Sequence, residues 1–180
     1  MEDAELMAQV QAGRLDRMAD LFERHVGPLL GFFFRLTARR GYSEDLVQEV
    51  FCRMLQYRKS FRVGSAFAPW MYQIARNVHR RQAKSVPVSE DEALLEVLPD
   101  ASESAHARLE REHRESLLRE ALRRLEPRKR ELLLLSRQPD LSYQQIAELT
   151  GSSVGAVKVQ VHRALKELRT IYLALEGGAA

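Results

Sequence analysis

The chain has 180 residues, which suits one ordinary domain or two small ones. Hydrophobic residues make up 45% and charged residues 29%, so the chain can bury real cores and does not belong to the disordered class. Its single cysteine, Cys52, excludes an intramolecular disulfide, and its apolar neighbours predict a buried thiol. We find no signal peptide and no apolar run of about 18 residues, so we expect a cytoplasmic protein without membrane insertion.

The net charge of +3 hides three blocks of different charge. Residues 1–86 carry 14 basic and 9 acidic side chains, residues 87–107 carry 6 acidic and no basic ones, and residues 108–180 carry 14 basic and 10 acidic ones. Basic blocks favour a polyanionic partner, usually nucleic acid, although two solvated helix surfaces are the alternative. The acidic block is rich in serine and contains two prolines, which predicts a flexible linker.

Helical periodicity covers almost the whole of the first block, and strand-like alternation is absent. The expected helices are Asp3–Ala12, Asp16–His25, a segment from Pro28 to about Gly41, a helix that begins at an N-cap on Ser43 and includes Leu46–Leu55, and Pro69–Lys84. Gly27 and Pro28 are expected to break the chain between the second and third of these. A loop is expected at Arg58–Ala66.

The last block has the same helical character. Its expected helices are Glu110–Leu125, Arg128–Arg137, Ser142–Thr150 and Val154 to about Leu175. We therefore predict an all-α protein with two small helical domains, residues 1–86 and 108–180, joined by a flexible linker at 87–107.

The most specific pattern lies in residues 142–169 and predicts a helix-turn-helix. Ser142 and Gln145 have the spacing of a capping box, which opens a short helix. Gly151 stands where the chain must turn sharply, and we expect a positive φ there. The spacing of Ala147, Gly151 and Val157 is that of the helix-turn-helix skeleton.

The second helix of this pair leaves small and basic residues on its exposed face. These residues are Ser153, Gly155, Ala156, Lys158, Val159 and His162, with Arg163 further along. In a major groove, Lys158 can reach a base edge or a phosphate, Ser153 a phosphate and Val159 a thymine methyl group. Arg163 would contact the phosphate backbone. The alternative is a plain helical hairpin with a solvated face.

Two surfaces stand out in residues 1–86. Asp45, Gln48 and Glu49 share one side of a helix through their i, i+3, i+4 spacing, which suits docking to a basic or polar helix, although an ordinary solvated face is the alternative. A second helix carries a cationic side. Its polar residues are Arg76, Asn77, Arg80, Arg81 and Lys84, with Phe67, Trp70 and Tyr72 just upstream.

Aromatic side chains beside cations suit single-stranded DNA, because bases stack and phosphates pair with charge. Trp70 and Ile74 also fit a core, and we favour that interpretation for both. The loop Arg58–Ala66 could hold an extruded base next to the helix.

Taken in order, these segments resemble a known family. DLVQEVF (residues 45–51), Phe61, FAPWMYQIARN (residues 67–77), a linker and LSYQQIAELTGSSVGAVKVQVHRALKELR (residues 141–169) are similar to the extracytoplasmic-function sigma factors of bacterial RNA polymerase. The resemblance covers nearly the whole chain. It implies a sigma factor that directs core polymerase to promoters, with a first domain for the polymerase and the melted −10 element and a second for the −35 duplex.

The resemblance also implies roles for single residues. Asp45, Gln48 and Glu49 fall at positions that contact the coiled coil of the largest polymerase subunit, and the second domain is expected at the flap. The implied −10 contacts are Phe61 in the specificity loop and Arg76, Asn77, Arg80, Arg81 and Lys84. The implied −35 contacts are Ser153, Gly155, Ala156, Lys158, Val159, His162 and Arg163. The basic faces and the long linker favour control by an anti-sigma factor that covers these surfaces.

Two departures from the family pattern concern DNA contacts. Pro69 stands where members commonly have arginine, and Val159-Gln160 replaces a more usual Ser-Arg pair. The first removes an expected contact, and the second is expected to change the −35 preference or lower the affinity.

Two other classes of function fit the sequence less well. A ligand-sensing or phosphate-sensing regulator needs a pocket or a phosphoacceptor aspartate at a strand end, and no strand is predicted. An enzyme needs a catalytic motif, and HExxH, GxSxG, P-loop and CxxC patterns do not occur. We therefore expect no catalytic residues, metal or cofactor.

Overall fold

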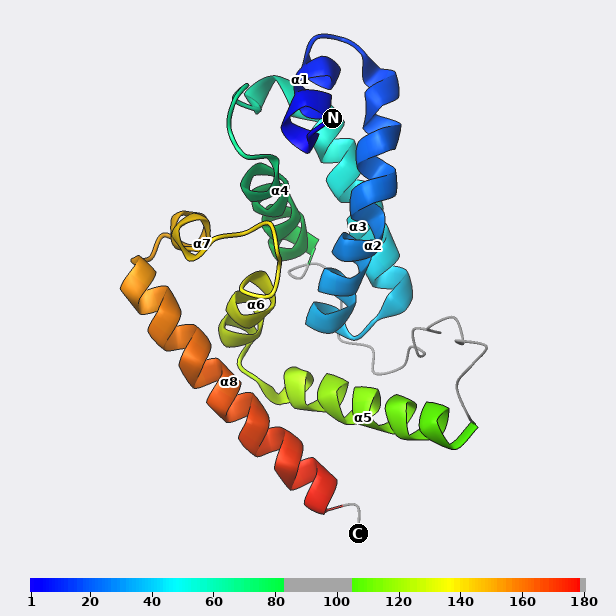
Figure 1. The fold of residues 1–180 in the computed structure, drawn as a ribbon, viewed down its shortest axis with the longest axis vertical. Helices are drawn as coiled ribbons and strands as arrows, with labels where there is room; N and C mark the ends of the chain where they lie inside the picture. Colours follow the sequence, from blue (N-terminus) through cyan, green and yellow to red (C-terminus); the bar gives the residue numbers. More distant parts are fainter. Residues whose placement is uncertain (83–104, 179–180) are drawn as a thin grey trace. The chain divides into compact units, whose positions relative to one another are not determined.

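The computed structural model describes residues 1–82 and 105–178, and these residues form helices and no strand (Figure 1). The described chain divides into two compact units, one of residues 1–34 and 41–82 and one of residues 35–40 and 105–178. An all-α fold in two helical parts is confirmed. Lys84 and most of the expected linker lie outside the described residues.

The first unit is a helical bundle around an aromatic and aliphatic core. Its elements are α1 (Asp3–Gln11), a 3₁₀ turn η1 (Leu15–Arg17), α2 (Met18–Thr37), α3 (Arg40–Gln56), a 3₁₀ turn η2 (Arg58–Ser60) and α4 (Phe67–Gln82). The ring of Phe32 lies edge-on to Phe33 and Tyr72, at centroid distances of 5.4 Å in both cases. These rings join α2 to α4 in the centre of the unit.

The expected break at Gly27 and Pro28 is wrong, because α2 runs through both residues. Proline lacks the amide hydrogen that would bond one turn back, and its ring crowds the preceding turn. Both residues are exposed, whereas Leu21 and Leu29 of the same helix are fully buried in its apolar face. Burial of that continuous apolar face keeps the helix intact.

The expected start of α3 at Ser43 is also wrong. Ala38 adopts a φ of +59°, which ends α2, and α3 begins at Arg40. Ser43 is fully buried, because it extends the inward stripe of Leu46 and Val47 by one turn. Cys52 lies outside this stripe and is exposed, which corrects the prediction of a buried thiol.

The second unit packs three helices against a long fourth one. Its elements are α5 (Ala105–Arg124), α6 (Pro127–Leu135), α7 (Tyr143–Thr150) and α8 (Val154–Gly177), and α5, α6 and α7 each contact α8. Helix α5 begins inside the stretch predicted as linker, so residues 105–107 are helical. The four leucines of α6, Leu132–Leu135, are all buried and fill the centre of the unit.

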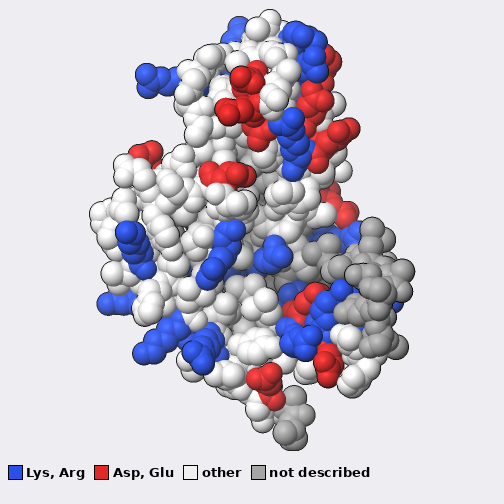
Figure 2. Space-filling model, viewed as in Figure 1, with Lys and Arg blue, Asp and Glu red and all other residues white. Residues whose placement is uncertain are grey.

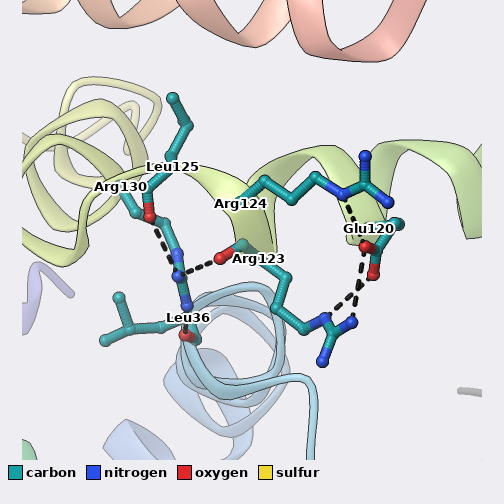
Figure 3. A network of polar contacts seen from close by, with 6 residues as sticks. All are labelled: Leu36, Glu120, Arg123, Arg124, Leu125 and Arg130. Atoms are coloured by element: carbon teal, nitrogen blue, oxygen red, sulfur yellow. Dashed lines mark hydrogen bonds and ion pairs between the residues drawn. The ribbon is translucent and has the colours of Figure 1, made fainter. Parts of the chain in front are cut away.

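Polar contacts fix the junction of α5 and α6 (Figure 3). The side chain of Glu126 caps α6 by accepting from the amides of Arg128 and Lys129. Arg130 of α6 donates to the carbonyl oxygens of Arg123 and Leu125, at 2.7 and 3.1 Å. These contacts set the direction in which α6 leaves the end of α5.

Candidate polymerase and DNA interfaces

The helix-turn-helix forms through local contacts that the sequence predicts. The hydroxyl oxygen of Ser142 accepts from the amide of Gln145 at 3.2 Å, and the Gln145 side chain accepts from the amide of Ser142 at 2.8 Å. Gly151 has a φ of +64°, and the amide of Ser152 donates to the carbonyl of Ala147 at 2.9 Å. This left-handed turn ends α7 and reverses the chain into α8.

The first half of α8 presents the predicted DNA-contacting residues to solvent. Ser153, Gly155, Lys158, Val159, His162 and Arg163 are exposed, and Ala156 is half-buried. Val157 and Val161 are buried on the other side against the rest of the unit. Ser153 also caps α8 by accepting from the amide of Ala156 at 3.2 Å. Figure 2 shows basic side chains along the outer face of α8.

The acidic patch of α3, which we define as Asp45, Gln48 and Glu49, lies on the side opposite the core. Asp45 and Gln48 are exposed and Glu49 is half-buried. Glu49 accepts a hydrogen bond of 2.6 Å from Arg53, one turn along, and this bond raises the pKa of Arg53. We had not singled out Arg53 in the sequence, although its i+4 spacing from Glu49 is a usual signal of such a pair.

The cationic surface of α4 is smaller than predicted. Asn77, Arg80 and Arg81 are exposed, and Asn77 accepts a hydrogen bond from Gln73 at 3.3 Å. Arg76 is only 2% exposed, because the residue lies on the inner side of α4, as Tyr72 does. The side chain is therefore not presented at the surface as expected, and its implied −10 contact stays a prediction.

Phe61 is likewise a core residue, with an exposed fraction of 2%. Its ring lies 5.4 Å from Trp70 and 6.4 Å from Phe67 between centroids, in edge-on contacts. The ring of Phe61 is therefore covered in this structure, and its implied −10 contact stays a prediction. Ile74 is buried and Trp70 half-buried, as the core interpretation requires.

A cleft of about 450 Å³ lies between the C-terminal half of α3 and the C-terminal half of α4. Glu49, Arg53 and Tyr57 line it from one side, and Asn77 and Arg81 line it from the other. Tyr57 is 41% exposed and supplies the aromatic surface that Phe61 does not. We did not predict Tyr57 as a site residue, although an aromatic directly before Arg58-Lys59 is a pattern that could have indicated it.

No described helix has both the length and the apolar character needed to cross a membrane. No group of three or more histidine, cysteine or acidic side chains with metal-binding geometry occurs among the described residues.

Comparison with known proteins identifies the family. The model of "Sigma-70 region 2" matches residues 21–85, and that of "Sigma-70, region 4" matches residues 115–168. The RNA polymerase sigma factor CarQ of Myxococcus xanthus is 32% identical over 177 residues, which cover 94% of this chain and 97% of CarQ. The ECF RNA polymerase sigma factor EcfG of Rhodopseudomonas palustris is 28% identical and covers 87% of this chain and 85% of its own length. This chain is an extracytoplasmic-function sigma factor.

Solved structures share the fold of this sigma factor. CnrH, solved in complex with the cytosolic domain of CnrY, has a TM-score of 0.70 at 23% identity and covers 96% of this chain and 97% of its own. RpoE of Bartonella quintana, solved with the anti-sigma factor NepR, has a TM-score of 0.63 at 23% identity and covers 85% of this chain and 94% of its own. These structures show that the fold of the sigma factor is a known helical architecture. Its family membership means that it directs RNA polymerase to promoters, and the family consists of DNA-binding initiation factors rather than enzymes.

Proposed function

We propose that the two units of this sigma factor divide promoter binding between them. The unit of α1 to α4 binds the polymerase core and the melted −10 strand, and the helix-turn-helix of α7 and α8 binds the −35 duplex. The observation that carries the proposal is the exposed first half of α8, where small and basic side chains follow a capped turn. A helix end of this composition fits a major groove.

The acidic patch of α3 is the proposed contact with the largest polymerase subunit. Asp45 and Gln48 are exposed on a rigid helix whose other side is buried, so a partner helix can lie along them without any rearrangement. The hydrogen bond between Glu49 and Arg53 limits the rotamers of both side chains. The partner segment in this proposal is the coiled coil of the largest polymerase subunit. The second unit is proposed to bind the flap of the polymerase.

The end of α4 is the proposed contact with the melted −10 strand. Asn77 offers an amide that can read a base edge, whereas Arg80 and Arg81 offer charge to the phosphates. The cleft beside Asn77 can accept an unstacked base, with Tyr57 as the aromatic side chain at its edge. Lys84 remains assigned to this surface from its sequence position alone.

On α8, Lys158 is proposed to contact a base or a phosphate, and Val159 is proposed to contact a thymine methyl group. Gly155 and Ala156 allow the backbone of α8 to approach the groove closely, and His162 lies one turn beyond Lys158. The hydroxyl of Ser153 accepts a bond from its own helix and keeps its hydrogen for a phosphate oxygen. Arg163 is assigned to the backbone.

The test is transcription from fragmented genomic DNA by core polymerase with and without the sigma factor. We expect new transcripts whose start sites share two short sequence elements at a fixed spacing. Lys158→Ala should lose preference within the upstream element, and Asn77→Ala within the downstream one. Initiation without a shared upstream element, or with Lys158→Ala changing only the downstream element, would contradict the assignment.

We further propose that a protein inhibitor of the anti-sigma class controls this sigma factor. Both would act in the cytoplasm, where the polymerase acts, and the sigma factor itself is proposed to have no enzymatic activity. The support is that the basic face of α8 and the acidic patch are exposed and that RpoE was solved with such an inhibitor. An inhibitor that covers these surfaces must compete with core polymerase. A partner that binds together with core polymerase and leaves transcription unchanged would contradict this proposal.

A further inference from the structure

The segment from Tyr57 to Phe61 connects α3 to the approach of α4 and borders the cleft through Tyr57. Only short local bonds stabilise it from within: the amide and the hydroxyl of Ser60 both donate to the carbonyl of Tyr57 at 2.8 Å. The indole of Trp70 donates to the hydroxyl of Ser60 at 3.2 Å. The amide of Phe61 also donates to the carbonyl of Arg58 at 3.2 Å, which closes the 3₁₀ turn.

A side chain distant in sequence, Gln11 of α1, also binds the backbone carbonyls of this segment. The side-chain nitrogen of Gln11 lies 2.8 Å from the carbonyl oxygen of Phe61 and 3.2 Å from those of Arg58 and Lys59. The amide carries two hydrogens, so it satisfies Phe61 directly and shares the second hydrogen between the other two. One side chain thus binds three carbonyls of a four-residue segment, from 47 to 50 residues away in sequence.

Gln11 can do this because α1 is itself firmly seated. Met7 and Val10 are completely buried under the bundle, and the carboxylate of Asp3 receives hydrogen bonds of 2.8 Å from Arg24 and 2.7 Å from His25. Gln11 is the last residue of α1, and its half-buried side chain projects from that rigid helix.

We propose that Gln11 is a positioning residue for −10 recognition: it fixes the backbone of residues 58–61 and so sets which bases the neighbouring site accepts. The inference rests on the proposed −10 site at Asn77 and Tyr57. Gln11 touches no DNA in this scheme. It acts through the segment that begins at the cleft residue Tyr57 and continues through Arg58 and Lys59.

The first test measures hydrogen exchange of residues 57–61 in the full chain. Gln11→Met keeps the length of the side chain and removes the donor, so the amides of Ser60 and Phe61 should exchange about tenfold faster. Gln9→Met is the matched control, because Gln9 lies on the same helix and donates to the Met1 sulfur at 3.3 Å instead. Gln11→Lys supplies three donors to the three carbonyls and should restore slow exchange. Equal exchange in Gln11→Met and wild type overturns the inference.

The second test measures base preference in the holoenzyme. Core polymerase with each variant binds a single-stranded oligonucleotide library that is randomised over the −10 positions, and the bound fraction is sequenced. Gln11→Met should flatten the preference at one or more positions, by about tenfold in the enrichment ratio, while Gln9→Met and Gln11→Lys keep it. An unchanged preference in Gln11→Met overturns the inference. If the wild-type holoenzyme shows no base preference, the proposed −10 site fails, and the inference fails with it.

Discussion

Charged side chains on the first unit are oriented by neighbours on the same or the next helix. Glu49 is paired with Arg53 within α3, and Asp3 is paired with Arg24 and His25 across α1 and α2. The first pair lies at the surface that is proposed to meet polymerase. The second is half-buried and holds the N-terminal helix. The same type of contact therefore has a binding role in one place and a stabilising role in the other.

Asp45→Arg tests the acidic patch by reversing one exposed charge. The affinity for core polymerase should fall about tenfold or more, because like charges would face each other across the interface, while the helical circular dichroism stays unchanged. Glu23→Arg makes the same charge change at an exposed position of α2 and serves as the control. Equal core affinity of both variants, measured by fluorescence anisotropy, would rule out the patch as the contact.

Asp3→Asn tests the seating of α1 and its dependence on pH. Burial would raise the pKa of Asp3, but hydrogen bonds from Arg24 and His25 outweigh burial and lower it. Because the pKa of Asp3 is lower in the folded state than its ordinary value of about 3.9, the ionised carboxylate stabilises the folded state at pH values above about 3.9. This stabilisation is lost as the pH falls through the lowered pKa. At pH 7 the variant should lose about 1 kcal/mol of unfolding free energy.

The measurement is urea unfolding of the full chain, followed by the fluorescence of Trp70, the single tryptophan, which reports on the first unit. The difference between Asp3→Asn and wild type should shrink below about pH 3.9. Asp16→Asn is the control, because the side chain of Asp16 is 64% exposed in its pair with Arg14. A difference between Asp3→Asn and wild type that is constant from pH 7 to pH 3 would contradict the prediction.

Glycine has opposite roles in the two parts of the helix-turn-helix. Gly151 ends α7 with a φ of +64°, where an alanine would be strained, and Gly155 lies within the first turns of α8, where an alanine would favour the helix. A Cβ atom at either position would meet no other atom within 4 Å. Backbone preference alone therefore decides the effect on stability.

Gly151→Ala should lower the unfolding free energy of the second unit by about 1 kcal/mol. Gly155→Ala should raise it by about 0.5–1 kcal/mol, but should weaken binding to a −35 duplex, because the added methyl group stands between α8 and the groove. Thermal unfolding by circular dichroism and anisotropy on a duplex probe measure the two effects. Shifts of the same sign in both melting temperatures would refute the backbone argument.

The two units should act on different DNA. Lys158→Ala in the holoenzyme should weaken binding to a −35 duplex by ~1–3 kcal/mol if Lys158 reads a base, and by less if it meets only phosphate, while affinity for a −10 single strand stays unchanged. Asn77→Ala should do the reverse, with a penalty that depends on base sequence. Arg80→Ala should weaken −10 strands of every sequence and reduce the salt dependence, as the loss of a phosphate contact does.

Anisotropy of each holoenzyme on both probes at several salt concentrations separates these effects. The probes are taken from the promoters found in the transcription experiment. If Lys158→Ala and Asn77→Ala impair both probes equally, the division of work between the two units is wrong.

The helix-turn-helix and the outward face of α8 follow from the sequence because they depend on neighbours within a few residues. The capping box of Ser142 and Gln145, the left-handed Gly151 and the cap at Ser153 are all local contacts, and the helical period then determines which side chains point outward. The acidic patch of α3 could be predicted for the same reason. The DNA and polymerase contacts of these residues stay predictions.

Only the tertiary structure shows which side chains are buried by segments that are distant in sequence. Pro28 remains within a helix because the apolar face of α2 is buried along its whole length. The sequence implies that Phe61 and Arg76 contact the −10 strand, yet both side chains are buried inside the bundle. The contact of Gln11 with residues 58–61 joins segments about 50 residues apart, and no periodicity connects them. Helical period determines which residues share a side, whereas packing between distant segments determines which side is covered and which loop is held.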